Sequence, residues 1–178
     1  LNDTGALVIE TGKYTGRAPD DKFFVDTPSV HNNIDWSRNK PIESEKFDAI
    51  LGKLIAYLQK KEIYIFDGKA GANSEYTRRF RFINEMPSQN LFIHQLLIRT
   101  DEEYNENNKI DFTVISAPNF HCVPEIDGVN SEAAIIINFE KKMAIICGTR
   151  YSGEMKKSVF SIMNYIMPHE NILPMHCS

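Results

Sequence analysis

Hydrophobic residues recur at helical spacing between residues 43 and 60. They are Phe47, Ile50, Leu51, Leu54, Ile55 and Leu58. This periodicity predicts an amphipathic helix whose apolar face packs into the core. The segment 153–167, GEMKKSVFSIMNYIM, predicts a second such helix. Its expected buried face consists of Val159, Ile162, Met163 and Ile166. A shorter helix is expected at 88–98.

Short apolar runs bounded by turn residues predict strands in the remaining chain. The expected strands are 6–12, 21–28, 62–71, 78–86, 110–119 and two runs within 132–149 that a polar turn at 140–142 connects. In RRFRFINEM (78–86), basic and apolar residues alternate, which is typical of a strand with one buried face. Strands and helices do not alternate regularly, so the expected fold class is α/β with an α+β tendency, a mixed sheet flanked by helices.

Composition narrows the classes of function. The 178 residues are 42% hydrophobic, enough for one main globular unit. A formal net charge of -4 argues against nucleic acid or an anionic membrane as a partner, so an anionic ligand would need a local cluster of cations. The three cysteines form no C-x-x-C pair, which favours a reducing compartment, and no apolar run is long enough for a membrane span. We therefore expect a cytoplasmic protein.

The first candidate for chemistry is the segment IETGKYTGRAPDDKFF, residues 9–24. Its Gly-Lys pair suggests a phosphate-binding loop, but Tyr14 follows Lys13, and Leu7 stands five positions before Gly12, where that loop needs glycine. What remains is a turn with Gly12 and Gly16 that presents Arg17. Composition alone favours an exposed basic hairpin here.

The second candidate, GTRYSGEMKKS (148–158), lies where an apolar strand ends and a helix begins. Such loops often form binding sites in α/β proteins, and a helix N-terminus favours anions. Tyr151 and Glu154 lie here. The positive charges of Lys156 and Lys157 interact unfavourably with the helix dipole near the N-terminus of the helix, so they cost stability unless a bound anion or metal-bound ligand compensates them. The alternative interpretation, an exposed first turn of a helix with solvated lysines, is equally compatible with this segment.

The third candidate is His176 beside Cys177. A structural zinc site needs two further ligands at regular spacing, so this pair alone is weak evidence for a metal.

Taken together, the three segments resemble the ATP-dependent phosphoenolpyruvate carboxykinases. TGKYTGRAPDDKFFV, YSGEMKKSVFSIMNY and PMHCS are similar to three motifs of that family, in the family's order. IDWSRNKPI, QNLFIHQLLIR and GVNSEAAIIINF match between them, so the resemblance covers essentially the whole chain.

The resemblance implies an N-terminal carboxykinase-like domain at 1–170, on the substrate side of the active site. Residues 171–178 would begin the C-terminal nucleotide-binding domain. The family is a lyase of gluconeogenesis that converts oxaloacetate and ATP to phosphoenolpyruvate, ADP and carbon dioxide. The implied partners are these small molecules, and the implied cofactors are Mn²⁺ (or Mg²⁺) and ATP.

The resemblance also assigns residue roles. Arg17, Tyr151 and Lys157 match the family's catalytic and substrate-binding residues, with Arg17 on a carboxylate or carbon dioxide. Lys157 and His176 match its metal and ATP ligands. A lysine coordinates a metal only as the neutral amine, and the adjacent charge of Lys156 is expected to help Lys157 lose its proton. Gly16, Glu154 and Lys156 are expected to support the site.

The family's ATP-binding P-loop and the aspartate that completes the metal shell would lie beyond Ser178. We therefore expect residues 1–178 alone to bind neither ATP nor metal and to be inactive. The alternative is a free-standing dicarboxylate- or anion-binding module without catalysis.

Overall fold

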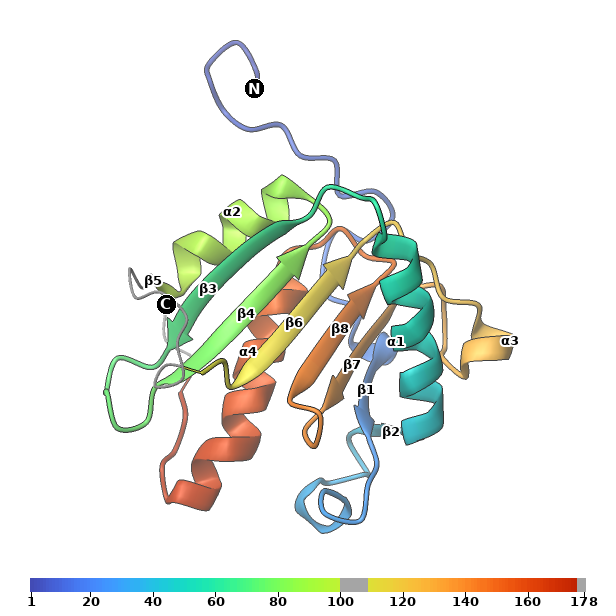
Figure 1. The fold of residues 1–178 in the computed structure, drawn as a ribbon, viewed down its shortest axis with the longest axis vertical. Helices are drawn as coiled ribbons and strands as arrows, with labels where there is room; N and C mark the ends of the chain where they lie inside the picture. Colours follow the sequence, from blue (N-terminus) through green and yellow to red (C-terminus); the bar gives the residue numbers. More distant parts are fainter. Residues whose placement is uncertain (100–108, 176–178) are drawn as a thin grey trace.

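The computed structural model describes residues 1–99 and 109–175, which form one eight-stranded sheet in the order β2-β1-β7-β8-β6-β4-β3-β5 (Figure 1). The strands are β1 (Lys22–Val25), β2 (Lys40–Ile42), β3 (Tyr64–Ala70), β4 (Arg78–Asn84), β5 (Ile98–Arg99), β6 (Phe112–Ala117), β7 (Ala134–Asn138) and β8 (Met143–Cys147). Strand β1 is parallel to β2 and β7, and β6 is parallel to β4 and β8. The pairs β7–β8, β3–β4 and β3–β5 are antiparallel, so the expected mixed sheet is confirmed.

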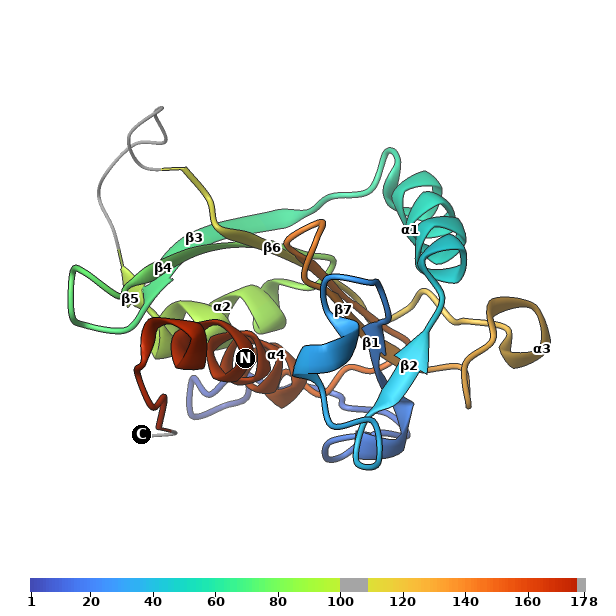
Figure 2. The ribbon, with the colours of Figure 1, turned by 90° about the horizontal axis from the view of Figure 1, so that it is seen from below.

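Helices cover both faces of this sheet. They are α1 (Ser44–Leu58), α2 (Pro87–Leu96), α3 (Pro124–Asp127) and α4 (Gly153–Ile166), with the short 3-10 helices η1 (Pro19–Asp21), η2 (His31–Asn33) and η3 (Met167–Glu170). Figure 2 shows α2 and α4 on one face and α1 on the other. Each face has its own apolar cluster, so the sheet is the central layer of three.

The two long predicted helices are confirmed, with narrower buried faces than expected. In α1, Phe47, Ile50 and Leu54 have no exposed surface, whereas Ile55 is 51% exposed. In α4, Val159 and Ile162 are buried, while the expected core residues Met163 and Ile166 are half-buried and pack against the rim of the cluster.

The alternation along β4 has a direct structural explanation. Phe80 and Phe82 are fully buried in the cluster beneath α2 and α4. Arg81 points to the opposite face, where its guanidinium donates to both carboxylate oxygens of Asp67 on β3, at 2.8 and 2.7 Å. Arg81 is therefore paired across the two strands with an acidic side chain.

The predicted strand at 6–12 is wrong. This segment has no strand and runs away from the sheet at the N-terminal end in Figure 1. Leu7, Val8 and Ile9 are 47%, 70% and 46% exposed. Apolar residues form a strand only where a neighbouring strand offers its backbone groups, and the described sheet leaves this segment unpaired.

Nothing in the described structure tests the expected boundary at residue 170, which stays a prediction. Cys122 and Cys147 are buried free thiols. Among the described residues, no helix is long and apolar enough to cross a membrane.

Candidate functional site

Two of the three candidate segments meet at one edge of the sheet. This edge is the one formed by the C-terminal ends of the parallel strands β6 and β8, not an outermost strand. Strand β1 begins there, because it is parallel to β7, which runs antiparallel to β8. The loop that precedes β1 and the loop that leads from β8 into α4 therefore lie side by side, although they are more than 130 residues apart in sequence.

Beside these two loops lies a hollow of about 420 Å³, between the segment that leads into β1, the segment that leads into β2, and helix α4. It is lined by Arg17, Pro19, Asp20, Lys22, Arg38, Asn39, Lys40, Glu154, Lys157, Phe160 and Ser161. Five of these residues are basic and two are acidic, so the hollow is cationic although the chain is acidic overall. Such a concentration of like charge in a concave site favours an anionic ligand.

Glu154 lies in the first turn of α4 and is 4% exposed. Its carboxylate accepts a hydrogen bond of 2.7 Å from the backbone N–H of Ala18. Burial raises the pKa of the Glu154 carboxyl, while the Ala18 N–H and the charges of Lys22 and Arg17 oppose that rise. Keeping this group ionised at neutral pH therefore costs stability.

Lys22 is a site residue that the sequence did not single out. Burial lowers the pKa of its ammonium to about 8; Glu154 opposes this shift, and the charges of Arg17 and Lys157 add to it. Its Nζ donates to Ser161 Oγ on α4 and lies 5.0 Å from the centre of the Phe24 ring. The only sequence signal was a lysine at the start of an otherwise apolar strand.

The depressed pKa of Lys22 predicts a pH dependence of stability. Between pH 8 and 10.5 the unfolded chain holds a proton that the folded chain has lost, so the contribution of Lys22 becomes less unfavourable as the pH rises through this window. At pH 7 the charged, half-buried Lys22 costs at most about 3 kcal/mol. We expect Lys22→Met to be more stable than the wild type at pH 7, with a difference that shrinks toward pH 10. Urea unfolding at several pH values measures it, and a difference independent of pH would refute the assignment.

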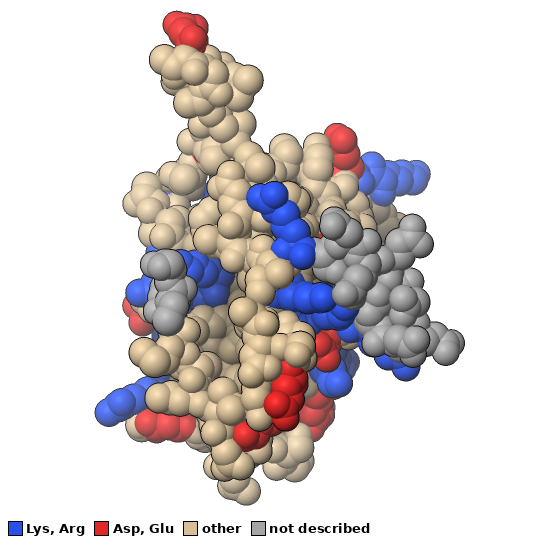
Figure 3. Space-filling view, turned by 90° about the vertical axis from the view of Figure 1, so that its left-hand side faces the viewer, with Lys and Arg blue, Asp and Glu red and all other residues tan. Residues whose placement is uncertain are grey.

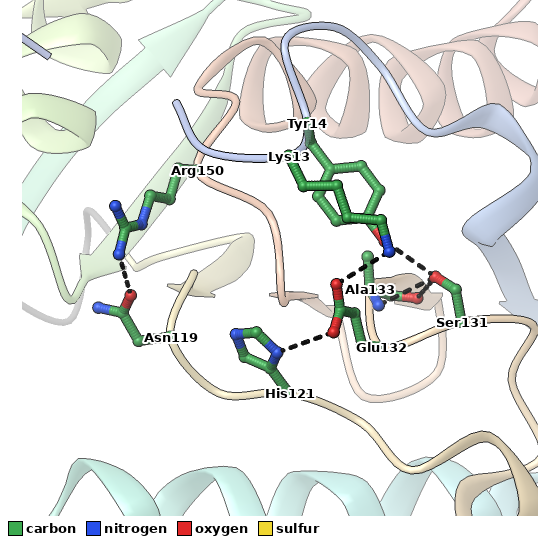
Figure 4. A network of polar contacts seen from close by, with 8 residues as sticks. All are labelled: Lys13, Tyr14, Asn119, His121, Ser131, Glu132, Ala133 and Arg150. Carbon is green, nitrogen blue, oxygen red and sulfur yellow. Dashed lines mark hydrogen bonds and ion pairs between the residues drawn. The ribbon is translucent and has the colours of Figure 1, made fainter. Parts of the chain in front are cut away.

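The loop before Arg17 also makes polar contacts with residues 131 and 132, which precede β7 (Figure 4). Lys13 donates to Glu132 at 3.1 Å, and His121 Nδ1 lies 3.2 Å from the same carboxylate. The hydroxyl groups of Tyr14 and Ser131 are 3.2 Å apart. These groups are exposed or half-buried, and Lys13 faces Glu132, not the hollow.

The structure brings together Arg17, Glu154 and Lys157 of the predicted site residues. Lys156 points elsewhere, into a second, larger hollow of about 760 Å³ between α4, α2 and the β3–β4 hairpin. Its lining includes Lys69 on β3 and Ile98 on β5, and Figure 3 shows that this side of the molecule carries both basic and acidic side chains among mostly uncharged atoms. Adjacent lysines on α4 thus serve different surfaces.

Tyr151 is half-buried and is not among the residues that line either hollow. Its ring lies across the start of α4, against Gly153. A Cβ at Gly153 would come within 2.5 Å of Tyr151 Cε1, so only glycine leaves room for this ring. At Gly16, by contrast, a Cβ would meet no atom within 4 Å, so the described structure does not require glycine there.

The predicted ligand His176 lies outside the described residues. Among residues 1–99 and 109–175, no group of three or more His, Cys, Asp or Glu side chains could hold a metal ion. Of the predicted metal ligands, only Lys157 is therefore placed.

Comparison with known proteins gives a match along the whole chain. A family model described as phosphoenolpyruvate carboxykinase, in its ATP form, matches residues 1–178. A protein of Fusobacterium nucleatum named phosphoenolpyruvate carboxykinase (ATP) is 86% identical over 178 residues. Proteins of the same name from Caldanaerobacter subterraneus and Bacillus cytotoxicus are 52% and 51% identical over 178 and 180 residues. Each match covers 100% of this chain but 34% of the relative, so the chain spans about a third of the length of these proteins.

Proposed function

Because the chain belongs to the family of ATP-dependent phosphoenolpyruvate carboxykinases, we propose that it forms the substrate side of such an enzyme's active site. The reaction would convert oxaloacetate and ATP to phosphoenolpyruvate, ADP and carbon dioxide. The observation that carries the proposal is the cationic hollow at the sheet edge, where Arg17, Lys22 and Lys157 converge. Oxaloacetate is a dianion, and this hollow offers it charge and donors.

Arg17 is the proposed partner for a substrate carboxylate. Its planar guanidinium presents paired N–H donors that match the two oxygens of a carboxylate. Lys157 would place a second nitrogen near the reacting carbons, and Tyr151 would approach from the start of α4. Preorganised positive groups in a partly enclosed site stabilise charge that develops during decarboxylation.

The family's divalent metal would take one nitrogen from Lys157, and we propose His176 as a further ligand. When bound, the metal, Mn²⁺ or Mg²⁺, would supply positive charge that stabilises a developing enolate, and ATP would supply the phosphoryl group. Lys157 fits the position of a nitrogen donor because it lies beside Arg17 in the hollow. The remaining donors and the nucleotide site would come from the rest of a protein of the relatives' length, in the cytoplasm.

Binding of oxalate, a small dicarboxylate, to the full-length protein in the presence of Mn²⁺ tests this proposal. We expect Arg17→Ala to lower the affinity for oxalate at least about tenfold, because a charge-assisted hydrogen bond contributes roughly 1.5–3 kcal/mol to binding. Lys13→Ala is the matched control, since Lys13 lies in the same loop and pairs with Glu132. Its affinity should stay within about twofold. Equal affinities of Arg17→Ala and wild type by calorimetry would overturn the proposed site.

The second candidate function is a free-standing anion-binding module. It is favoured by one observation: the cationic hollow is built within this chain. Such a module would bind oxalate yet convert no oxaloacetate, whereas the carboxykinase in its full length should release carbon dioxide from oxaloacetate in the presence of ATP. We further propose that residues 1–178 alone do not turn over.

A further inference from the structure

We propose that Glu154 is a positioning residue that fixes the place of Arg17 through the backbone of the next residue, Ala18. The ligand in this inference rests on the proposed function, but the contact itself does not. The Glu154 carboxylate is buried, and it grips a loop that is 136 residues distant in sequence.

The backbone of Ala18 is held on both sides. Its N–H donates to Glu154, and its carbonyl accepts a 3.0 Å hydrogen bond from the Asp21 N–H, which closes the turn of η1. Ala18 is itself 8% exposed, and the following Pro19 restricts the chain further. Since Arg17 is the next residue toward the N-terminus, the bond from Glu154 determines where its Cα lies and from which direction its side chain enters the hollow.

The other side-chain attachments of the loop lie farther from Arg17 in sequence: Tyr14 bonds to Ser131 and packs against the core, and Lys13 pairs with Glu132. The Lys13–Glu132 pair joins side chains that are 70% and 36% exposed, and such surface pairs contribute little. At Gly16, immediately before Arg17, even an added Cβ would meet no atom within 4 Å, so no close packing surrounds that position. Among the described side-chain contacts, the buried Glu154–Ala18 bond is therefore the one adjacent to Arg17, and the proposal assigns the position of Arg17 to it.

A positioning role and a purely electrostatic role of Glu154 predict opposite changes in anion affinity when its carboxylate is removed. Removing a carboxylate from a cationic hollow should, by charge alone, tighten the binding of an anion. If Glu154 instead holds the Arg17 loop, its loss should weaken anion binding, because Arg17 would no longer be preorganised. Glutamine separates the two effects, since its amide oxygen still accepts the Ala18 N–H.

The test measures oxalate affinity with Mn²⁺, KM and kcat for oxaloacetate, and hydrogen exchange of the Ala18 amide in the full-length protein. For Glu154→Ala we expect oxalate affinity to fall about tenfold, KM to rise by a similar factor with a smaller change in kcat, and Ala18 exchange to accelerate. Glu154→Gln should keep Ala18 protected and bind oxalate at least as tightly as the wild type. Glu132→Ala, which removes the exposed attachment, should change affinity by less than about twofold.

Wild-type or tighter affinity in Glu154→Ala would overturn the inference, as would unchanged exchange of the Ala18 amide. If Glu154→Ala does not fold, Glu154→Asp replaces it: the charge stays, the oxygen is withdrawn by one methylene, and weaker binding is again expected. Failure of the wild type to bind oxalate would refute the proposed function alone, because the exchange measurement tests the Glu154–Ala18 contact without any ligand.

Discussion

Replacing Lys157 with methionine in the full-length protein is expected to lower kcat/KM for oxaloacetate about a thousandfold, the upper range for loss of one preorganised group that stabilises developing charge. The Lys157 amine lies in the same hollow as Arg17, whereas its neighbour Lys156 lines the separate hollow beside α2. Lys156→Met is therefore the matched control, with an expected loss of tenfold or less. Methionine keeps most of the side-chain volume but removes the ammonium, which lies 5.5 Å from the centre of the Phe160 ring.

Steady-state kinetics of both variants, with thermal unfolding as a check on folding, measure this difference. Equal losses in the two variants would show that the hollow does not separate the lysines functionally. A second consequence concerns Lys22, whose pKa is lowered in part by the charge of Lys157. Lys157→Met removes this charge and should therefore raise the pKa of Lys22.

The hollow places five basic and two acidic residues together, and burial makes this arrangement costly in the free protein at Lys22 and Glu154. Lys22 is held with a lowered pKa, and Glu154 with a raised one, and in both cases burial is the main cause. Charged groups that disfavour the free fold are typical of binding sites, because a ligand of opposite charge compensates them. The charge of Lys22 therefore lowers stability in the free protein and favours anion binding.

Sequence patterns predicted the elements whose burial follows a regular period. Helices α1 and α4 and strand β4 are long enough for the period to be visible, and it located the centre of each buried face, although the faces of both helices are narrower than expected. Strands β2 and β5 and helix α3 contain three, two and four residues, too few to show any period. The strand expected at 6–12 failed for a different reason, since pairing depends on a neighbour that local composition does not reveal.

The candidate site was predictable only as far as short motifs name their residues. Arg17, Glu154 and Lys157 were found in this way, and the fold brings them together. Lys22 was not predicted as a site residue, because its partial burial results from packing between β1 and α4, which no local sequence pattern encodes. The different directions of Lys156 and Lys157 depend on the rotational phase of α4 against the sheet.

Gly148 is the residue whose replacement should most destabilise the site's framework. It follows β8, has a φ of +68°, and leads into the loop that begins α4. A Cβ there would lie 2.3 Å from the Glu132 carbonyl oxygen and 2.9 Å from Ala133 Cα, and backbone atoms cannot rotate away. Left-handed strain of about 1–2 kcal/mol and overpacking of about 1–3 kcal/mol add up to a loss of roughly 3 kcal/mol for Gly148→Ala.

Gly16→Ala is the matched control for this prediction, because a Cβ at Gly16 meets no atom and its φ is not positive. It should change stability by less than about 0.5 kcal/mol. Hydrogen exchange of the β7 and β8 amides reports the local free energy of opening and compares the two variants directly. Since β8 leads through Gly148 to the first turn of α4, Gly148→Ala should also accelerate exchange of the Ala18 amide, which depends on Glu154. Protection of β7 and β8 equal to that of the wild type would mean that the backbone yields at this point, and that the geometry of the Glu154 turn does not depend on Gly148.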